Sequence, residues 1–249
     1  KVINMSYMFS SNDIFNKDLS NWDVTNVNNM SHMFNQATLF NSPLNWGTKT
    51  GKVVDMSKMF SLASSFNQAI DGWDVSKVIT TNLMFYKTNS FNQDLNSWNV
   101  GSLINPSQMF QENTSFNGNM ASWVFTSDPT KSINMSSMFQ NATSFNRDIS
   151  NWNVSSVTNT DYMFYGASRF NSNISNWNVG RVTDMGYMFE RASSFNQNLC
   201  PWGPKLPAIF DYDTFGAAAD MFYLSGCANT NTPTGRTGPW CAVTNCPFD

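Results

Sequence analysis

A Met-Phe pair recurs at a nearly fixed interval, and this period constrains the fold more than any other feature of the sequence. Successive pairs are 25 or 26 residues apart, with one interval of 29, and Phe-Asn follows six residues after each Phe. The pairs begin at Met8, Met33, Met59, Met84, Met109, Met138, Met163 and Met188. Such a period predicts a solenoid, in which each unit is one coil that buries its apolar side only against its neighbours.

Within one unit, two apolar periods follow each other. Trp22 and Val24 alternate with polar residues, as in a short strand with one buried face, whereas Met30, Met33 and Phe34 have the spacing of a helical turn. The predicted fold class is therefore an α/β repeat solenoid of about eight coils, each with a short parallel strand and a helical turn. We expect the solenoid to cover residues 1–202 and a Cys-, Pro- and Gly-rich C-terminal cap to cover residues 203–249.

The Asn after the second Phe of each unit predicts a structural role. A coil that turns sharply leaves backbone donors and acceptors unpaired, and an amide side chain can satisfy both. We interpret these residues as a buried Asn ladder rather than a ligand site. Its members are Asn16, Asn41, Asn67, Asn92, Asn117, Asn146, Asn171 and Asn196.

All four cysteines lie in the last fifth of the chain, at Cys200, Cys227, Cys241 and Cys246. A zinc site is the alternative to disulfides, but zinc prefers close C-x-x-C pairs or histidines, and His32 is distant in sequence. Two disulfides imply an oxidising compartment. Three pairings are open, and we prefer Cys200 with Cys227 and Cys241 with Cys246. Trp240, in the same tail, is the aromatic residue expected to be exposed, unless it packs on a disulfide.

Residues 145–157 and 182–197 carry the repeat in its fullest form, and both segments resemble the BspA-like surface-protein repeat. The resemblance extends over roughly residues 2–202. It implies a leucine-rich-repeat-like solenoid with parallel strands on one concave face, and a secreted or surface-anchored protein, some relatives of which act in adhesion. The tail around Trp240 resembles the ends of algal and other protist members.

Strand alternation places a row of polar side chains on the expected concave face. The row is Asp23, Asp74, Asn99, Asn153 and Asn178. Short carboxylates and amides in this arrangement are candidates for binding sugar hydroxyls or calcium. A merely soluble strand face is the alternative.

Two further features concern the surface. Among the N-glycosylation sequons, Asn113, Asn141 and Asn173 are the candidates for modification.

Extra residues at 47–52 and 126–131 interrupt the repeat, and we expect both insertions to protrude from the same edge, as insertions in solenoids do.

Composition argues against several classes of function. The net charge is −3 and no basic stripe is present, which argues against nucleic acid as a partner. No apolar run approaches the roughly 20 residues of a membrane span. No nucleophile with its base, carboxylate pair or metal cluster is evident, and His32 is expected to be solvated, so we predict no catalytic residue, no metal and no cofactor.

These features predict a non-enzymatic extracellular or cell-surface scaffold that presents a repetitive polar surface for adhesion. Its partners would be an extracellular protein or polysaccharide. The alternative is a structural subunit of an extracellular filament, sheath or flagellar hair, whose partners are copies of itself. Because the chain starts inside a repeat, it is expected to be a mature product or an excised part of a longer precursor.

Overall fold

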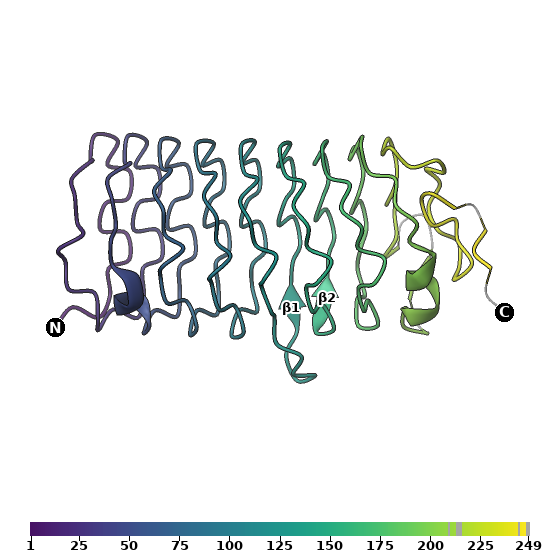
Figure 1. Cartoon of the computed structure of the whole chain (residues 1–249), viewed down its shortest axis with the longest axis horizontal. Helices are drawn as coiled ribbons and strands as arrows, with labels where there is room; N and C mark the ends of the chain where they lie inside the picture. The colour runs from purple at the N-terminus through teal and green to yellow at the C-terminus, as the bar shows by residue number, and fades with distance from the viewer. Residues whose placement is uncertain (209, 213–215, 244, 248–249) are drawn as a thin grey trace.

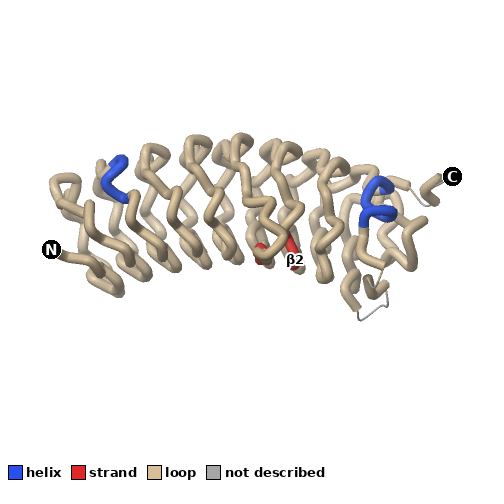
Figure 2. The backbone as a smooth tube through the Cα atoms, turned by 90° about the horizontal axis from the view of Figure 1, so that it is seen from below, coloured by secondary structure: helices blue, strands red, loops and turns tan. Residues whose placement is uncertain are grey.

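The computed structural model describes residues 1–208, 210–212, 216–243 and 245–247. In it the tandem repeats stack as successive coils from the N-terminus to the C-terminus (Figure 1). Its regular elements are few, as the tube view also shows (Figure 2). They are the 3-10 helix η1 (Gly47–Thr50), strand β1 (Ile133–Asn134), strand β2 (Val157–Asn159) and the 3-10 helix η2 (Cys200–Lys205).

Parallel pairing between coils lies later in each repeat than the sequence predicts. β1 pairs with β2 in parallel, and isolated parallel bridges join equivalent residues of other coils, as between Asn29 and Asp55. These residues come after the Trp-x-Val segment, where the strand was expected. There the backbone turns instead, since Val27 N–H donates to Val24 O at 3.0 Å. The expectation of a strand at Trp-x-Val is therefore wrong.

The expected helical turn of each coil is a run of β-turns. Met33 N–H donates to Met30 O at 3.2 Å, and Asn35 N–H donates to His32 O at 3.1 Å. His32 has a φ of 58°, which a right-handed helix does not allow. The intervening N–H groups bond to the next coil, as Phe34 N does to Met59 O at 2.9 Å. Apolar spacings of three and four fit such turns as well as a helix.

Aromatic rings fill the interior in columns parallel to the stacking direction. The ring centroids of Phe34 and Phe40 lie 4.0 Å apart within one coil, and those of Phe34 and Phe60 lie 5.6 Å apart between coils. Stacked pairs of this kind each add about 0.5–1.5 kcal/mol beyond their area burial. In the Trp column the indole N–H donates to a carbonyl of the preceding coil, as Trp46 does to Leu19 O at 2.9 Å. Each coil is thus tied to its neighbour from inside.

A ninth repeat lies in the region expected to be the cap. Met221-Phe222 follows Met188-Phe189 after 33 residues, an interval too long to be seen as the same period. The ring of Phe222 stacks on Phe189 at 5.8 Å, and Phe189 N–H donates to Met221 O at 2.9 Å. The repeat therefore continues beyond residue 202.

The tail contains two disulfides with a pairing other than the one preferred from sequence. Cys200 bonds to Cys246 and Cys227 to Cys241, so the preferred pairing is wrong. The reason is that the tail folds back over the end of the stack, where Asn198 and Cys241 form an antiparallel bridge. Trp240 is fully buried there and donates to Arg236 O at 2.9 Å, which overturns its expected exposure.

Candidate functional site

The two consecutive turns of each coil form one continuous surface, which we call the turn face. It consists of the paired left-handed residues of every coil, four positions apart, and the residue before each of them. The left-handed pairs are Tyr7 and Ser11, His32 and Gln36, Lys58 and Leu62, Leu83 and Lys87, Gln108 and Glu112, Ser137 and Asn141, Tyr162 and Gly166, Tyr187 and Arg191, and Asp220 and Leu224.

Side chains at these positions are costly for the fold. The left-handed conformation costs an L-residue about 1–2 kcal/mol, and glycine is the residue that adopts it without strain. Nevertheless Gly166 is the only glycine in these pairs. The buried Met and Phe positions keep nearly the same residue in every coil, whereas the left-handed positions carry aromatic, basic, acidic, amide and aliphatic residues in turn. Varied side chains therefore stand at strained positions along this surface.

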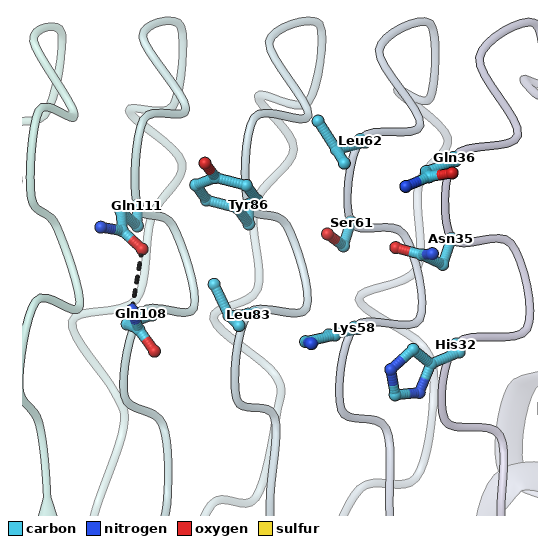
Figure 3. A pocket seen from close by; sticks show the side chains of 10 residues that line it. All are labelled: His32, Asn35, Gln36, Lys58, Ser61, Leu62, Leu83, Tyr86, Gln108 and Gln111. Atoms are coloured by element: carbon cyan, nitrogen blue, oxygen red, sulfur yellow. Dashed lines mark hydrogen bonds between the residues drawn. The ribbon is translucent and has the colours of Figure 1, made fainter.

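The turn face is hollowed over its N-terminal half. The depression has a volume of about 460 Å³ and lies where Ser61, a small residue that is only 3% exposed, stands between Asn35 and Tyr86 of the neighbouring coils. Figure 3 shows its lining side chains, which come from four successive coils. They are His32, Asn35, Gln36, Lys58, Ser61, Leu62, Leu83, Tyr86, Gln108 and Gln111.

Amide groups border the depression and are held by one another. Gln108 Nε2 donates to Gln111 Oε1 at 3.1 Å, and Gln111 Nε2 donates to Gln140 Oε1 at 2.7 Å. At the other end Gln36 Oε1 accepts from Ser11 Oγ at 3.0 Å. An amide has two donor hydrogens and two acceptor lone pairs, so these bonds use part of its capacity. The remainder can bind hydroxyl or amide groups of a ligand.

His32 lies at one end of the depression and is half-buried, not solvated as expected. Its ring stacks on Tyr7 at 4.3 Å, and its Nε2 lies 3.4 Å from the Tyr7 hydroxyl. Burial, followed by the charge of Lys58, lowers the pKa of His32. Its buried Nδ1 has no hydrogen-bond partner among the described residues. The ring therefore lies at this end of the depression with its unpartnered nitrogen enclosed.

The predicted concave-face residues all make a local hydrogen bond. Each uses its side-chain oxygen to accept the backbone N–H two residues later, as Asp74 Oδ1 does from Ser76 at 3.0 Å. The five residues, which we call the edge row, are Asp23, Asp74, Asn99, Asn153 and Asn178. They stabilise the turn after Trp, because short polar side chains satisfy local N–H groups that a turn leaves unpaired.

Carboxylates on the two surfaces are perturbed in opposite directions. In the edge row, hydrogen bonds from Thr25 and Ser76 hold the pKa of Asp23 and Asp74 below the usual value. On the turn face, burial and then the charge of Asp184 raise the pKa of Asp161, whose Oδ1 is buried without a partner in the described part of the chain.

The Asn residues after the second Phe form a ladder from coil to coil. Asn41 N–H donates to Asn16 Oδ1 at 2.9 Å, and the same bond recurs to Asn196, whose Oδ1 accepts from Ala228 N–H at 3.1 Å. The members are Asn16, Asn41, Asn67, Asn92, Asn117, Asn146, Asn171 and Asn196. They are exposed or half-buried, so the expectation that they are buried is wrong. They lie at the corner of the coil, not inside it.

The three sequons differ in accessibility. Asn113 is fully buried and donates to Phe91 O at 3.2 Å, so the expectation that its amide is accessible is wrong. Asn141 is half-buried at a left-handed position of the turn face, and Asn173 is exposed.

The insertions lie at the edge opposite the tight upper turns. Residues 126–131 form the loop that extends below β1, and η1 lies at the same lower edge (Figure 1). Arg181 Nη1 donates to Lys131 O at 2.8 Å and so fixes the larger loop. Residues 47–52 are not simply a solvent loop, because Thr50 is buried and its hydroxyl donates to Asp74 O at 3.0 Å.

Within the described ranges, no group of three or more His, Cys, Asp or Glu side chains is placed to hold a metal ion. In the same part of the chain, no helix has the length and apolar character that crossing a bilayer requires.

Comparison with known families identifies the repeat. The model of the family described as "Mycoplasma protein of unknown function, DUF285" matches residues 1–50, 45–132 and 126–225. The chain belongs to this family. The last match includes Met221-Phe222, in agreement with the ninth repeat of the structure. No curated protein and no solved structure matches the chain significantly.

The turn face is the surface that sequence reasoning missed. A signal for it exists in the sequence: the residues between the constant Met and Phe positions change chemical class from coil to coil. That variation indicates exposure, but only the backbone conformation reveals that two positions in each coil are strained.

Proposed function

We propose that this protein is a non-enzymatic extracellular scaffold whose turn face recognises a polymeric partner, protein or polysaccharide, in adhesion. The observation that carries the proposal is the display of varied side chains at left-handed positions, where glycine costs least. Strained residues that persist in a regular repeat support a role outside folding. The constant aromatic columns make the face rigid, so that binding does not require a loop to lose conformational entropy.

An extracellular location is part of the proposal. The two disulfides in the described tail support it, because such bonds persist in oxidising compartments. If the source glycosylates secreted proteins, we propose Asn173 as the most accessible acceptor and Asn141 as the second.

We also propose that the chain is a BspA-like member of its family. The repeat of Met-Phe, Phe-Asn and Trp supports this assignment. A leucine-rich-repeat-like architecture receives less support, since regular strands and helices are few in the described chain.

The test is a binding screen with a stripped turn face. Wild type is applied to arrays of polysaccharides and extracellular-matrix proteins, beside a variant that carries Lys58→Gly, Leu83→Gly, Gln108→Gly, Tyr162→Gly and Tyr187→Gly. We expect wild type to bind and the stripped variant to fold but lose binding. Asn99→Ala, in the edge row, is the matched control and should bind as wild type. Binding that survives in the stripped variant would overturn the proposal.

A second candidate function is assembly of copies into a filament or sheath. The mode of stacking supports it, since the same backbone groups of each coil bond to the next coil, as Phe34 N does to Met59 O at 2.9 Å, and repeats joined in this way can add neighbour to neighbour. Mass-resolved sizing and electron microscopy of the purified chain separate the two functions: regular fibres support assembly, and monomers that bind the arrays support recognition.

A further inference from the structure

We propose that the depression of the turn face is a binding site for a neutral polysaccharide, which lies along the stacking direction of the coils. This inference rests on the recognition function proposed above and names the site and the class of ligand.

The shape of the depression suits a chain of sugar rings. It is lined by four successive coils, from His32 to Gln108, and so extends along the stack (Figure 3). With coils about 4.8 Å apart, its length is roughly 14 Å. Its volume of about 460 Å³ is in the range of ligand sites. The repeat along its length favours a polymer whose own units repeat.

Part of the lining is apolar, and its aromatic ring is held in place. Leu62 and Leu83 contribute aliphatic surface, and Tyr86 contributes an aromatic ring. The Tyr86 hydroxyl donates to Glu112 Oε1 at 3.4 Å, and Lys87 Nζ lies 5.2 Å from the ring centroid. Lys87 also pairs with Glu112 at 3.2 Å. The ring is therefore held in place before a ligand arrives, and its apolar area can cover the C–H groups of a sugar.

The polar lining suits hydroxyl groups rather than charges. Asn35, Gln36, Gln108 and Gln111 supply amides, which both donate and accept hydrogen bonds, as sugar hydroxyls do. No carboxylate lines the depression, and Lys58 is the single cation among the lining residues. An anionic polymer would need several cations to offset the loss of its hydration.

His32 supplies a further observation. Its Nδ1 is buried and has no partner in the described structure, while the ring itself lines one end of the depression. Because this atom is enclosed, a ligand in the depression can touch only the rest of the ring. The lowered pKa of His32 keeps the ring neutral near pH 7.

A protein partner is the competing occupant. A shallow polar groove of this length suits an extended peptide less well, because the amides come from side chains and no strand edge runs along the groove to pair with a peptide backbone. Binding of a protein to the same residues is therefore an outcome of the test.

The test measures binding of soluble neutral glucans, mannans, galactans and xylans by calorimetry and affinity electrophoresis. Tyr86→Ala and Gln108→Ala remove the aromatic ring and one amide. Loss of one aromatic contact of about 1.4 kcal/mol corresponds to about a tenfold weaker affinity, which is the expected result for Tyr86→Ala. Val124→Ala, an exposed apolar residue that does not line the depression, is the folding and surface control. Thermal unfolding of each variant checks that the coils remain folded.

Each outcome decides between the two proposals. Binding of a neutral polysaccharide that weakens in Tyr86→Ala and Gln108→Ala, but not in Val124→Ala, supports the inference. Tyr165 precedes the left-handed Gly166, as Tyr86 precedes the left-handed Lys87, and it does not line the depression. If Tyr165→Ala weakens polysaccharide binding and Tyr86→Ala does not, the site is elsewhere on the turn face, and only this inference fails. A protein ligand lost in Tyr86→Ala, with no polysaccharide bound, overturns the ligand class and leaves recognition intact. Absence of any ligand overturns both.

Discussion

The edge row and the turn face are both periodic polar surfaces of the same coils, yet their side chains act differently. In the edge row, Asp74 and its equivalents bond to their own backbone two residues later. On the turn face, residues such as Lys58 and Leu83 stand at strained positions and project outward. A recurring polar residue therefore does not by itself indicate a binding site. What decides is whether its hydrogen-bonding capacity is already used by the fold.

The largest expected effect concerns the stability supplied by the edge row. Alanine at Asp23, Asp74 and Asn99 together removes three local caps. With about 1 kcal/mol for the cap at Asp74 and the same for the cap at Asn99, which lie in neighbouring coils and act together, the free energy of unfolding should fall by roughly 2 kcal/mol. Urea denaturation of the variant and of wild type measures this change in the free energy of unfolding.

The same triple variant should keep the affinity of wild type for any ligand that the arrays identify. A variant that retains full stability but loses binding would reverse the roles assigned to the two surfaces.

A smaller effect of opposite sign is expected on the turn face. Lys58→Gly removes the backbone strain of a left-handed residue, which stabilises the folded state by about 1–2 kcal/mol. It also increases the conformational freedom of the unfolded chain, which lowers the stability by about 0.5–1 kcal/mol. We expect a net gain of stability of no more than about 1.5 kcal/mol, measured by urea denaturation. Ser137→Gly, at the equivalent position outside the depression, should behave alike. Marked destabilisation of both would mean that these side chains serve folding.

The smallest effect comes from the opposite pKa shifts of the two surfaces. The lowered pKa of Asp74 stabilises the fold above the usual pKa of 3.8, and this contribution is lost as pH falls through the folded value. The raised pKa of Asp161 has the reverse sign, so its ionisation opposes folding at neutral pH and ceases to do so in acid.

We therefore expect Asp161→Asn to be more stable than wild type at pH 7, by less than about 0.5 kcal/mol, with the gain vanishing near pH 3. Asp74→Asn should show the reverse pattern: it should be least stable relative to wild type at neutral pH, and its free energy of unfolding should change less than that of wild type as the pH falls. Denaturation curves recorded from pH 7 to pH 3 test both variants. Identical pH profiles for the two would contradict the contrast between the surfaces.

The stacking of the repeats could be predicted from sequence because the Met, Phe and Trp positions recur in register. The finer structure could not. The spacing of Met30, Met33 and Phe34 fits a helix and a pair of β-turns equally, since both bring every third or fourth residue to one side. Likewise the alternation at Trp22 and Val24 resembles a strand, although the side chain of Asp23 bends the backbone into a turn.

By itself, the sequence determined the repeat, the residues of the core and the presence of a Cys-rich tail, because these depend on apolar identity and spacing along the chain. The tertiary structure decided which cysteines pair, that Met221-Phe222 forms a further repeat, and that Ser61 leaves a depression beside Tyr86. Each of these depends on which residues of different coils lie side by side. That proximity is set by hydrogen bonds between coils, such as Phe34 N to Met59 O, which leave no local pattern in the sequence.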